Sequence, residues 1–233
     1  MKVVVGGCSM SDYTGLGTKQ TYGEILAQNI DAEYIHHGAG MGSNYRIWRN
    51  ITNLVMNNEI TEDDLILIQY TQPSRQEFWS GLIEDDDNKR FMGPNKQETR
   101  ELKYNGDIVR WKSNMNLYGM NNLEKKFFKL KEEYFTSTEF DLERFEYNHY
   151  LFHNTIVSKN IKIAYIVMDN EIAKFIDRFN KNEEIHIPED MSTKIYPTSK
   201  DIHLLDDGCH LNQLGHIHLA TIIEKFLKKK QWI

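Results

Sequence analysis

Short apolar runs with almost no polar interruption recur along this sequence, and they narrowly limit what the chain can fold into. Lys2 to Gly6 is a β-branched run that ends at two glycines, and Leu65 to Ile68 is a continuous apolar run after Asp64. A run without polar alternation predicts a strand that is covered on both faces, as in a parallel sheet. Glu33 to His36 and Lys162 to Val167 predict further strands.

The segments between these runs carry apolar residues at helical spacing. One stripe of the segment Asn44 to Met56 holds Ile47, Trp48, Ile51, Leu54 and Val55, as is typical of an amphipathic helix. Other predicted helices span Thr21 to Asn29, Phe140 to Ser158, Glu171 to Asn180 and Leu214 to Lys229. Strands that alternate with helices predict a doubly wound, flavodoxin-like α/β fold, with a mostly parallel sheet and helices on both faces.

The middle of the chain departs from this alternation. From residue 80 to about residue 135 the composition turns polar and the apolar periodicity breaks, which indicates an insertion. Within it, Glu101 to Tyr104 and Ile108 to Trp111 flank Asn105-Gly106, the strongest short signal for a β-hairpin. Because 233 residues fit one large domain, we expect a single domain over 1–233 with a hairpin-bearing insertion at about 80–135.

The charge of the chain argues against a nucleic-acid partner. Its 28 basic and 34 acidic residues leave a formal net charge of −6, whereas nucleic-acid binders carry a basic patch or stripe. No apolar stretch approaches the ~20 residues of a membrane-spanning helix. The apolar region before Cys8 is too short for a secretion signal, and two cysteines cannot build a disulfide framework.

Residues that carry chemistry follow the predicted strands. Ligands of open parallel sheets bind beyond the carboxyl ends of the strands, so the residues that follow each strand are the candidates for a functional site. Ser9 follows the first strand, a glycine-rich segment from His37 to Asn44 follows the second, and Gln69 to Arg75 follows the third. Near the end of the chain, Asp206 to Asn212 precedes the last predicted helix. A serine, glycine amides and an acid closely followed by a histidine are the groups that acyl transfer requires.

These groups match the physical needs of a serine nucleophile. A hydroxyl is a weak nucleophile until an imidazole takes its proton, and the imidazole needs a carboxylate to orient it. Ser9 is the candidate nucleophile, His210 the base and Asp207 the orienting carboxylate, with Asp206 as the competitor for that last role. The oxyanion needs preorganised donors, for which the Ser9 and Gly42 amides are candidates.

At these residues the chain resembles the SGNH (GDSL-type) hydrolases. Their first block, usually Gly-Asp-Ser, would be Gly7-Cys8-Ser9; their second-block glycine would be Gly42; and their last block, Asp-x-x-His, would be Asp207-Gly208-Cys209-His210. The resemblance implies a serine esterase that needs no cofactor and acts on a small-molecule or glycan ester, with carbohydrate-linked acetyl esters as the substrate class. The Gly-Cys-Ser form of the first block resembles that of uncharacterised phage and bacterial members of the superfamily. The chain is expected to be cytoplasmic or virion-associated.

The third block departs from the family pattern. Family members usually carry Gly-x-Asn-Asp after this strand, where the asparagine amide is the third oxyanion donor, whereas this chain has Gln69-Tyr70-Thr71-Gln72. The Thr71 hydroxyl or the Gln72 amide could take over that role. Arg75 and Trp79, from the third loop, and Asn44, which ends a Gly-x-Ser-Asn turn, are predicted to contact substrate.

Several alternatives stay open beside the esterase reading. The missing third-block asparagine motivates a non-catalytic carbohydrate-binding protein on the same scaffold, and an acyltransferase would use the same residues. A metal site is disfavoured because His216 and His218 are two residues apart on a predicted helix and do not share a face. Cys8 and Cys209 are expected to be small buried residues. The oligomeric state carries no signal in the sequence.

Overall fold

The computed structural model describes residues 1–9, 11–12, 20–38, 43–71, 75–79, 107–111, 126, 130, 138–167, 184–186 and 210–233. Its centre is a sheet in the order β2-β1-β3-β6-β7 in which every neighbouring pair is parallel. The strands are β1 (Lys2–Gly7), β2 (Glu33–Gly38), β3 (Leu65–Gln69), β6 (Lys162–Val167) and β7 (Glu184–His186). This order of first to fifth strand, 2-1-3-4-5, is that of flavodoxin-like folds, so the predicted fold class is confirmed.

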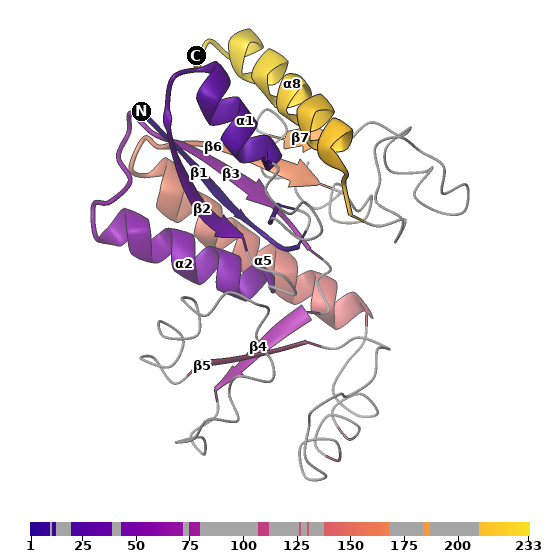
Figure 1. Cartoon of the computed structure of the whole chain (residues 1–233). Coiled ribbons are helices and arrows are strands. Elements are labelled where there is room, and N and C mark those ends of the chain that lie inside the picture. Colours follow the sequence, from indigo (N-terminus) through magenta and orange to yellow (C-terminus); the bar gives the residue numbers. More distant parts are fainter. Residues whose placement is uncertain are drawn as a thin grey trace.

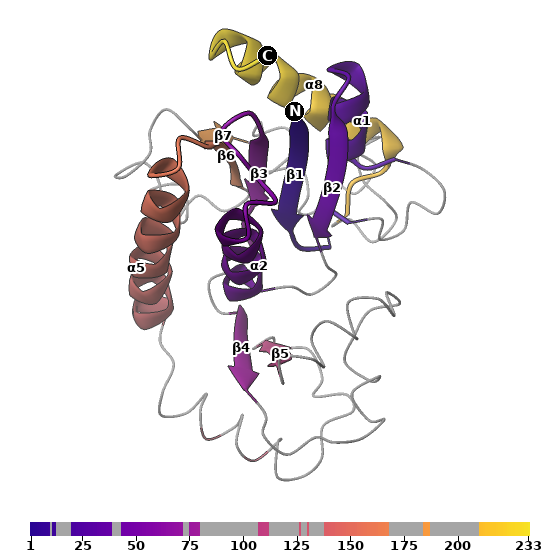
Figure 2. The same ribbon diagram turned by 90° about the vertical axis from the view of Figure 1, so that its left-hand side faces the viewer.

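Helices cover both faces of the sheet (Figure 1, Figure 2). α1 (Tyr22–Asn29) and α8 (Gln213–Lys229) lie on one face, and α2 (Asn44–Met56) and α5 (Thr138–Val157) lie on the other. In β1, Val3 and Val5 pack into the core under α1 and α8, whereas Val4 packs into the core under α2 and α5. Two covered faces explain why the three strands β1, β3 and β6 are nearly continuous apolar runs.

Side-chain caps set where the helices begin. The Thr21 hydroxyl accepts a hydrogen bond from the Glu24 N–H at the start of α1, and the Ser43 hydroxyl accepts one from the Arg46 N–H at the start of α2. The Asn212 Oδ1 accepts one from the Gly215 N–H at the start of α8, over 3.0 Å. Each cap satisfies an N–H that has no partner inside its helix. Among the helices in the described ranges, none is both long and apolar enough to cross a membrane.

The predicted element boundaries agree closely with those of the structure. The helix over Asn44–Met56 and the strand over Lys162–Val167 have the predicted limits, and α5 and α8 each differ by one or two residues. β7 was not predicted, since three residues are too few to form a recognisable apolar pattern. The helix predicted over Glu171 to Asn180 falls outside the described residues.

One prediction about the segment after β3 is wrong. Residues 75–79, predicted as part of a loop, form the strand β4 (Arg75–Trp79), which pairs antiparallel with β5 (Asp107–Trp111). The strand predicted at Ile108 to Trp111 therefore forms, but its described partner is distant in sequence. Turn signals report only local pairing, which is why β4 was missed. Glu101 to Tyr104 lies outside the described residues, and the domain limits stay a prediction.

The β4–β5 pair borders the edge of the sheet at which ligands of such folds bind. Figure 2 shows it next to α2, beyond the carboxyl ends of β1 and β2. The chain reaches it directly from the end of β3.

Candidate active site

Ser9 lies in a tight turn at the carboxyl end of β1. The Ser11 N–H and the Ser11 hydroxyl both donate to the Cys8 carbonyl, over 3.0 Å and 2.9 Å. The chain therefore folds back directly after the strand, with Ser9 as the second residue of the turn. A Cβ at Gly7 would lie 2.1 Å from the Ser11 Oγ, and a Cβ at Gly38 would lie 2.7 Å from the same atom. Glycine at the ends of β1 and β2 leaves the space that Ser11 occupies.

His210 meets Ser9 across almost the whole length of the chain. Its Nε2 lies 2.8 Å from the Ser9 Oγ, which is a hydrogen-bond distance. This distance lies within the roughly 2.6–3.2 Å over which a base can take a proton from a hydroxyl. The next two residues fix the histidine's backbone, because Leu211 is buried in the core under α8 and Asn212 caps that helix.

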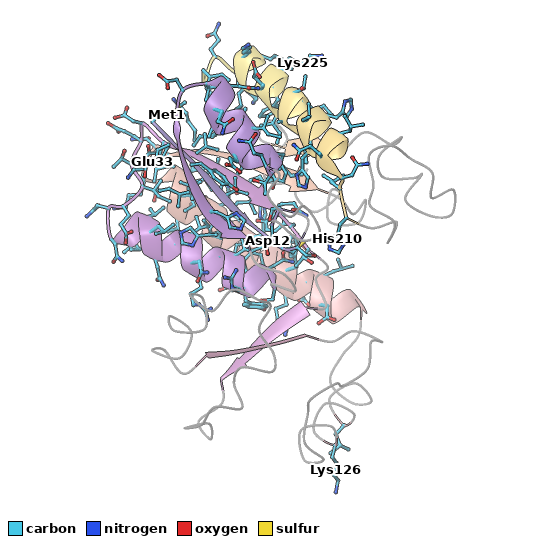
Figure 3. The ribbon with its side chains drawn as sticks, in the orientation of Figure 1. Met1, Asp12, Glu33, Lys126, His210 and Lys225 are labelled. Carbon is cyan, nitrogen blue, oxygen red and sulfur yellow. The ribbon has the colours of Figure 1, made fainter. Side chains whose placement is uncertain are left out.

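An acid–imidazole pair, Asp12 with His36, lies beside Ser9. Figure 3 shows Asp12 and His210 at the same end of the sheet. The Asp12 Oδ1 is 3.3 Å from the His36 Nε2, and the Tyr34 hydroxyl is 3.0 Å from the Nδ1 of the same ring. Both Asp12 and His36 are partly exposed. Sequence reasoning did not find this pair, although the position of Asp12 three residues after Ser9 was a usable signal.

Cys8 is a buried free thiol next to the candidate nucleophile, as the sequence predicts. The Gln69 Nε2 donates to its Sγ over 3.5 Å, so the first residue after β1 contacts the last residue of β3. Cys209 lies outside the described residues.

Thr71 and Asn44 are joined by two hydrogen bonds. The Asn44 Nδ2 donates to the Thr71 carbonyl over 2.8 Å, and the Thr71 N–H donates to the Asn44 Oδ1 over 2.9 Å. Asn44 is only 2 % exposed and Thr71 only 5 %. The Asn44 amide therefore holds the main chain of Thr71, and its predicted contact with substrate stays a prediction.

Tyr70 fixes the same stretch of chain from the opposite side. The Trp48 Nε1–H donates to its hydroxyl over 3.2 Å, and the hydroxyl lies 2.6 Å from the His149 Nδ1. Burial, and to a smaller extent the neighbouring His153, lowers the pKa of His149 to about 3. Burial also raises the pKa of Tyr70. Both groups are therefore neutral at neutral pH, and the hydrogen bond between them ties the end of β3 to α2 and α5.

His216 has a structural task at the start of α1. Its Nδ1 accepts a hydrogen bond from the Tyr22 N–H over 3.0 Å, and the two rings stack with their centroids 5.8 Å apart. Burial lowers the pKa of His216 to about 4, so the ring is neutral and able to accept at neutral pH. His216 thus links the first turn of α8 to the first turn of α1.

The remaining candidates are not placed by the described part of the chain. Asp207, Asp206, Gly42 and Gln72 fall outside it, and for Arg75 and Trp79 only the backbone is described. The orienting carboxylate and the Gly42 amide donor therefore stay predictions.

Comparisons with known proteins agree with this arrangement at the level of the fold. No model of a protein family matches the chain, and no curated protein matches it. A protein from Desulfitobacterium hafniense DCB-2 that is assigned to the lipolytic G-D-S-L family is similar over 97 % of this chain and 99 % of its own, with a TM-score of 0.54 and 11 % identity. A lipase/acylhydrolase from Enterococcus faecalis is similar over 98 % of this chain and 96 % of its own, with a TM-score of 0.53 and 13 % identity.

Along nearly its whole length, the chain therefore shares the fold of a protein assigned to the lipolytic G-D-S-L family and of a lipase/acylhydrolase. The fold that the resemblance in the motifs implies is confirmed.

Proposed function

We propose that this protein is a serine ester hydrolase of the SGNH type. The observation that carries the proposal is the contact of 2.8 Å between the Ser9 Oγ and the His210 Nε2. In the proposed reaction, Ser9 attacks the ester carbonyl while His210 takes its proton and passes it to the departing alcohol. Water, deprotonated by the same ring, then releases the acid and regenerates Ser9. Asp207 is proposed to orient the imidazole. The similarity in fold to a lipase/acylhydrolase supports ester hydrolysis in general.

The proposed oxyanion hole combines the Ser9 N–H, the Gly42 N–H and a group from Thr71. The Thr71 N–H already donates to the Asn44 Oδ1, so the side-chain hydroxyl of Thr71 is its remaining donor for the oxyanion. Gln72 is the alternative. A donor aimed at the developing negative charge is worth roughly 10²–10³ in rate, so the identity of this third donor has a measurable consequence.

The proposed substrate is an acyl ester, with an O-acetyl group on a carbohydrate as the narrower hypothesis. Asp12 and His36 are partly exposed beside the Ser9 turn, and such polar groups suit an alcohol rich in hydroxyls. Release of acetate from acetylated oligosaccharides, compared with hydrolysis of 4-nitrophenyl acetate and octanoate, tests this narrower claim. Preference for octanoate without acetate release would contradict it.

The decisive experiment replaces the nucleophile. Ser9→Ala is expected to abolish hydrolysis of 4-nitrophenyl acetate and labelling by a fluorophosphonate probe, because the attacking oxygen is removed. Ser158→Ala, at an exposed position after α5, is the matched control and should retain both. Unchanged turnover in Ser9→Ala would exclude the mechanism.

The same probe separates the rival functions. A carbohydrate-binding protein without catalysis should leave Ser9 unlabelled, whereas a hydrolase or an acyltransferase should be labelled there. Addition of an alcohol acceptor distinguishes these two, because only a transferase should form the new ester in preference to the free acid.

A further inference from the structure

The pairing of Asn44 with Thr71 joins the first residue of α2 to the segment that follows β3. Its two hydrogen bonds use the donor and the acceptor of the Asn44 side chain together with the N–H and C=O of Thr71. The two residues are 27 positions apart in sequence and both are buried. Breaking the pairing would leave buried polar groups without partners, which costs more than an ordinary hydrogen bond contributes. The main chain of Thr71 is therefore held firmly.

Asn44 is itself fixed to the sheet. It is the first residue of α2, whose N-terminal cap Ser43 accepts from the Arg46 N–H. Ile47 and Ile51, one and two turns further along this helix, are fully buried and pack so closely over β1 that a Cβ at Gly6 would lie 3.1 Å from each of them. Any shift of Asn44 would have to move this packed helix.

Thr71 and Ser9 follow neighbouring strands at one edge of the sheet. β1 and β3 are paired up to Gly6 and Ile68, and the Gln69 Nε2 at the end of β3 donates to the Cys8 Sγ that follows β1. Ser9 is the next residue after Cys8, and Thr71 is two residues after Gln69. This is the position where the order of the strands reverses and flavodoxin-like folds bind their ligands.

We propose that Asn44 is a positioning residue that holds Thr71 beside Ser9, so that the Thr71 hydroxyl is ready to donate to the oxyanion. The inference rests on the proposed esterase function. Oxyanion donors are effective because they are oriented before the charge develops. With its main chain clamped, Thr71 can vary only by rotation about its Cα–Cβ bond, and a β-branched side chain has few such rotamers.

The first test compares substitutions of equal size on the same helix. In Asn44→Asp the side chain can still accept from the Thr71 N–H, but a carboxylate oxygen now faces the Thr71 carbonyl. We expect the kcat for 4-nitrophenyl acetate to fall about 10–100-fold with KM changed less than about threefold, since the interaction lost is one made in the transition state. Asn53→Asp, exposed on α2, makes the same chemical change and should retain the kcat of the native protein.

The second test asks whether Asn44 acts through the Thr71 hydroxyl. Thr71→Val keeps the shape of the side chain and removes the donor. If the inference is correct, Asn44→Ala combined with Thr71→Val will have a kcat no more than about threefold below that of Thr71→Val alone, because residues that act as one unit are non-additive. All rates are divided by the concentration of active sites, counted with the fluorophosphonate probe, so that misfolded molecules do not contribute.

Two results would overturn the inference. One is a full kcat in Asn44→Ala, and the other is an effect of Asn44→Ala that multiplies that of Thr71→Val. Both leave the proposed function intact provided that Ser9→Ala is inactive. If the native protein and Ser9→Ala are equally inactive, the proposed function itself fails.

Discussion

The polar side chains of Ser11 and Asn44 donate hydrogen bonds to backbone carbonyls at the candidate site. Nothing in the neighbouring sequence indicates these roles. Ser11 closes the Ser9 turn, and Asn44 clamps Thr71. Ser9 and His210 could be predicted because each lies in a motif with fixed spacing after a strand or before a helix. The bonds from Asn44 to Thr71 could not be predicted, since a contact between a side chain and a distant main chain leaves no periodic pattern.

The turn makes a prediction about Gly7. In Gly7→Ala the added methyl group would lie 2.1 Å from the Ser11 Oγ and 2.8 Å from the Ser11 Cβ, so the turn has to shift and carry Ser9 away from His210. We expect ester hydrolysis to fall at least about tenfold, because catalysis is sensitive to misplacement of about 1 Å. Gly7→Ala combined with Ser11→Gly removes both clashing atoms and should regain part of the activity. No recovery in a folded double variant would contradict this account.

At the scale of the elements, unbroken apolar runs predicted the strands and helical stripes predicted the helices that cover them. The pattern failed where pairing is non-local, as for Arg75–Trp79 with Asp107–Trp111, or where the strand has three residues, as for Glu184–His186. It also gave no sign of how elements are joined by polar groups. Tyr70 and His216 each make such a junction.

The Tyr70 junction can be tested by removing one oxygen. Tyr70→Phe would deprive the Trp48 Nε1–H and the His149 Nδ1 of the hydroxyl between them. We expect the free energy of unfolding to fall by about 1–3 kcal/mol, the cost of buried polar groups that lose their partner. Tyr147→Phe on α5, where the residue is 64 % exposed, should change it by no more than about 0.5 kcal/mol. Urea unfolding measures both, and equal values would refute the prediction.

The His216 junction makes stability depend on pH. Burial lowers the pKa of His216 from 6.5 to about 4 in the folded protein. The unfolded chain therefore binds a proton below pH 6.5 while the folded chain does not. The contribution of neutral His216 to the free energy of unfolding is complete above pH 6.5. As the pH falls to 4, this contribution decreases by about 3 kcal/mol in total.

His216→Asn should make the free energy of unfolding less dependent on pH in this range, because an amide does not titrate. Thr221→Asn, at an exposed position of the same helix, introduces no titrating group and should retain the native dependence. Urea unfolding at pH 7, 5 and 4 measures the slopes. Identical slopes in the native protein and His216→Asn would show that another group is responsible.

For the whole molecule, the fold is shared with proteins that are only 11–13 % identical in sequence. A doubly wound sheet needs apolar strands, covering helices and a small number of residues at the carboxyl edge, and very different sequences meet those conditions. The sequence could therefore indicate the architecture and the edge at which chemistry would occur. It could not indicate the substrate, which depends on side chains that surround the edge and follow no common pattern.

Ser9 and His210 are 201 positions apart, and one of them follows the first strand while the other precedes the last helix. During synthesis, the ribosome must add 201 residues after Ser9 before these two groups can meet. Until then Ser9 would have no base beside it and would be a weak nucleophile. In the proposed mechanism, turnover would begin only when α8 has docked and His210 has reached Ser9, so turnover would report the docking of that helix.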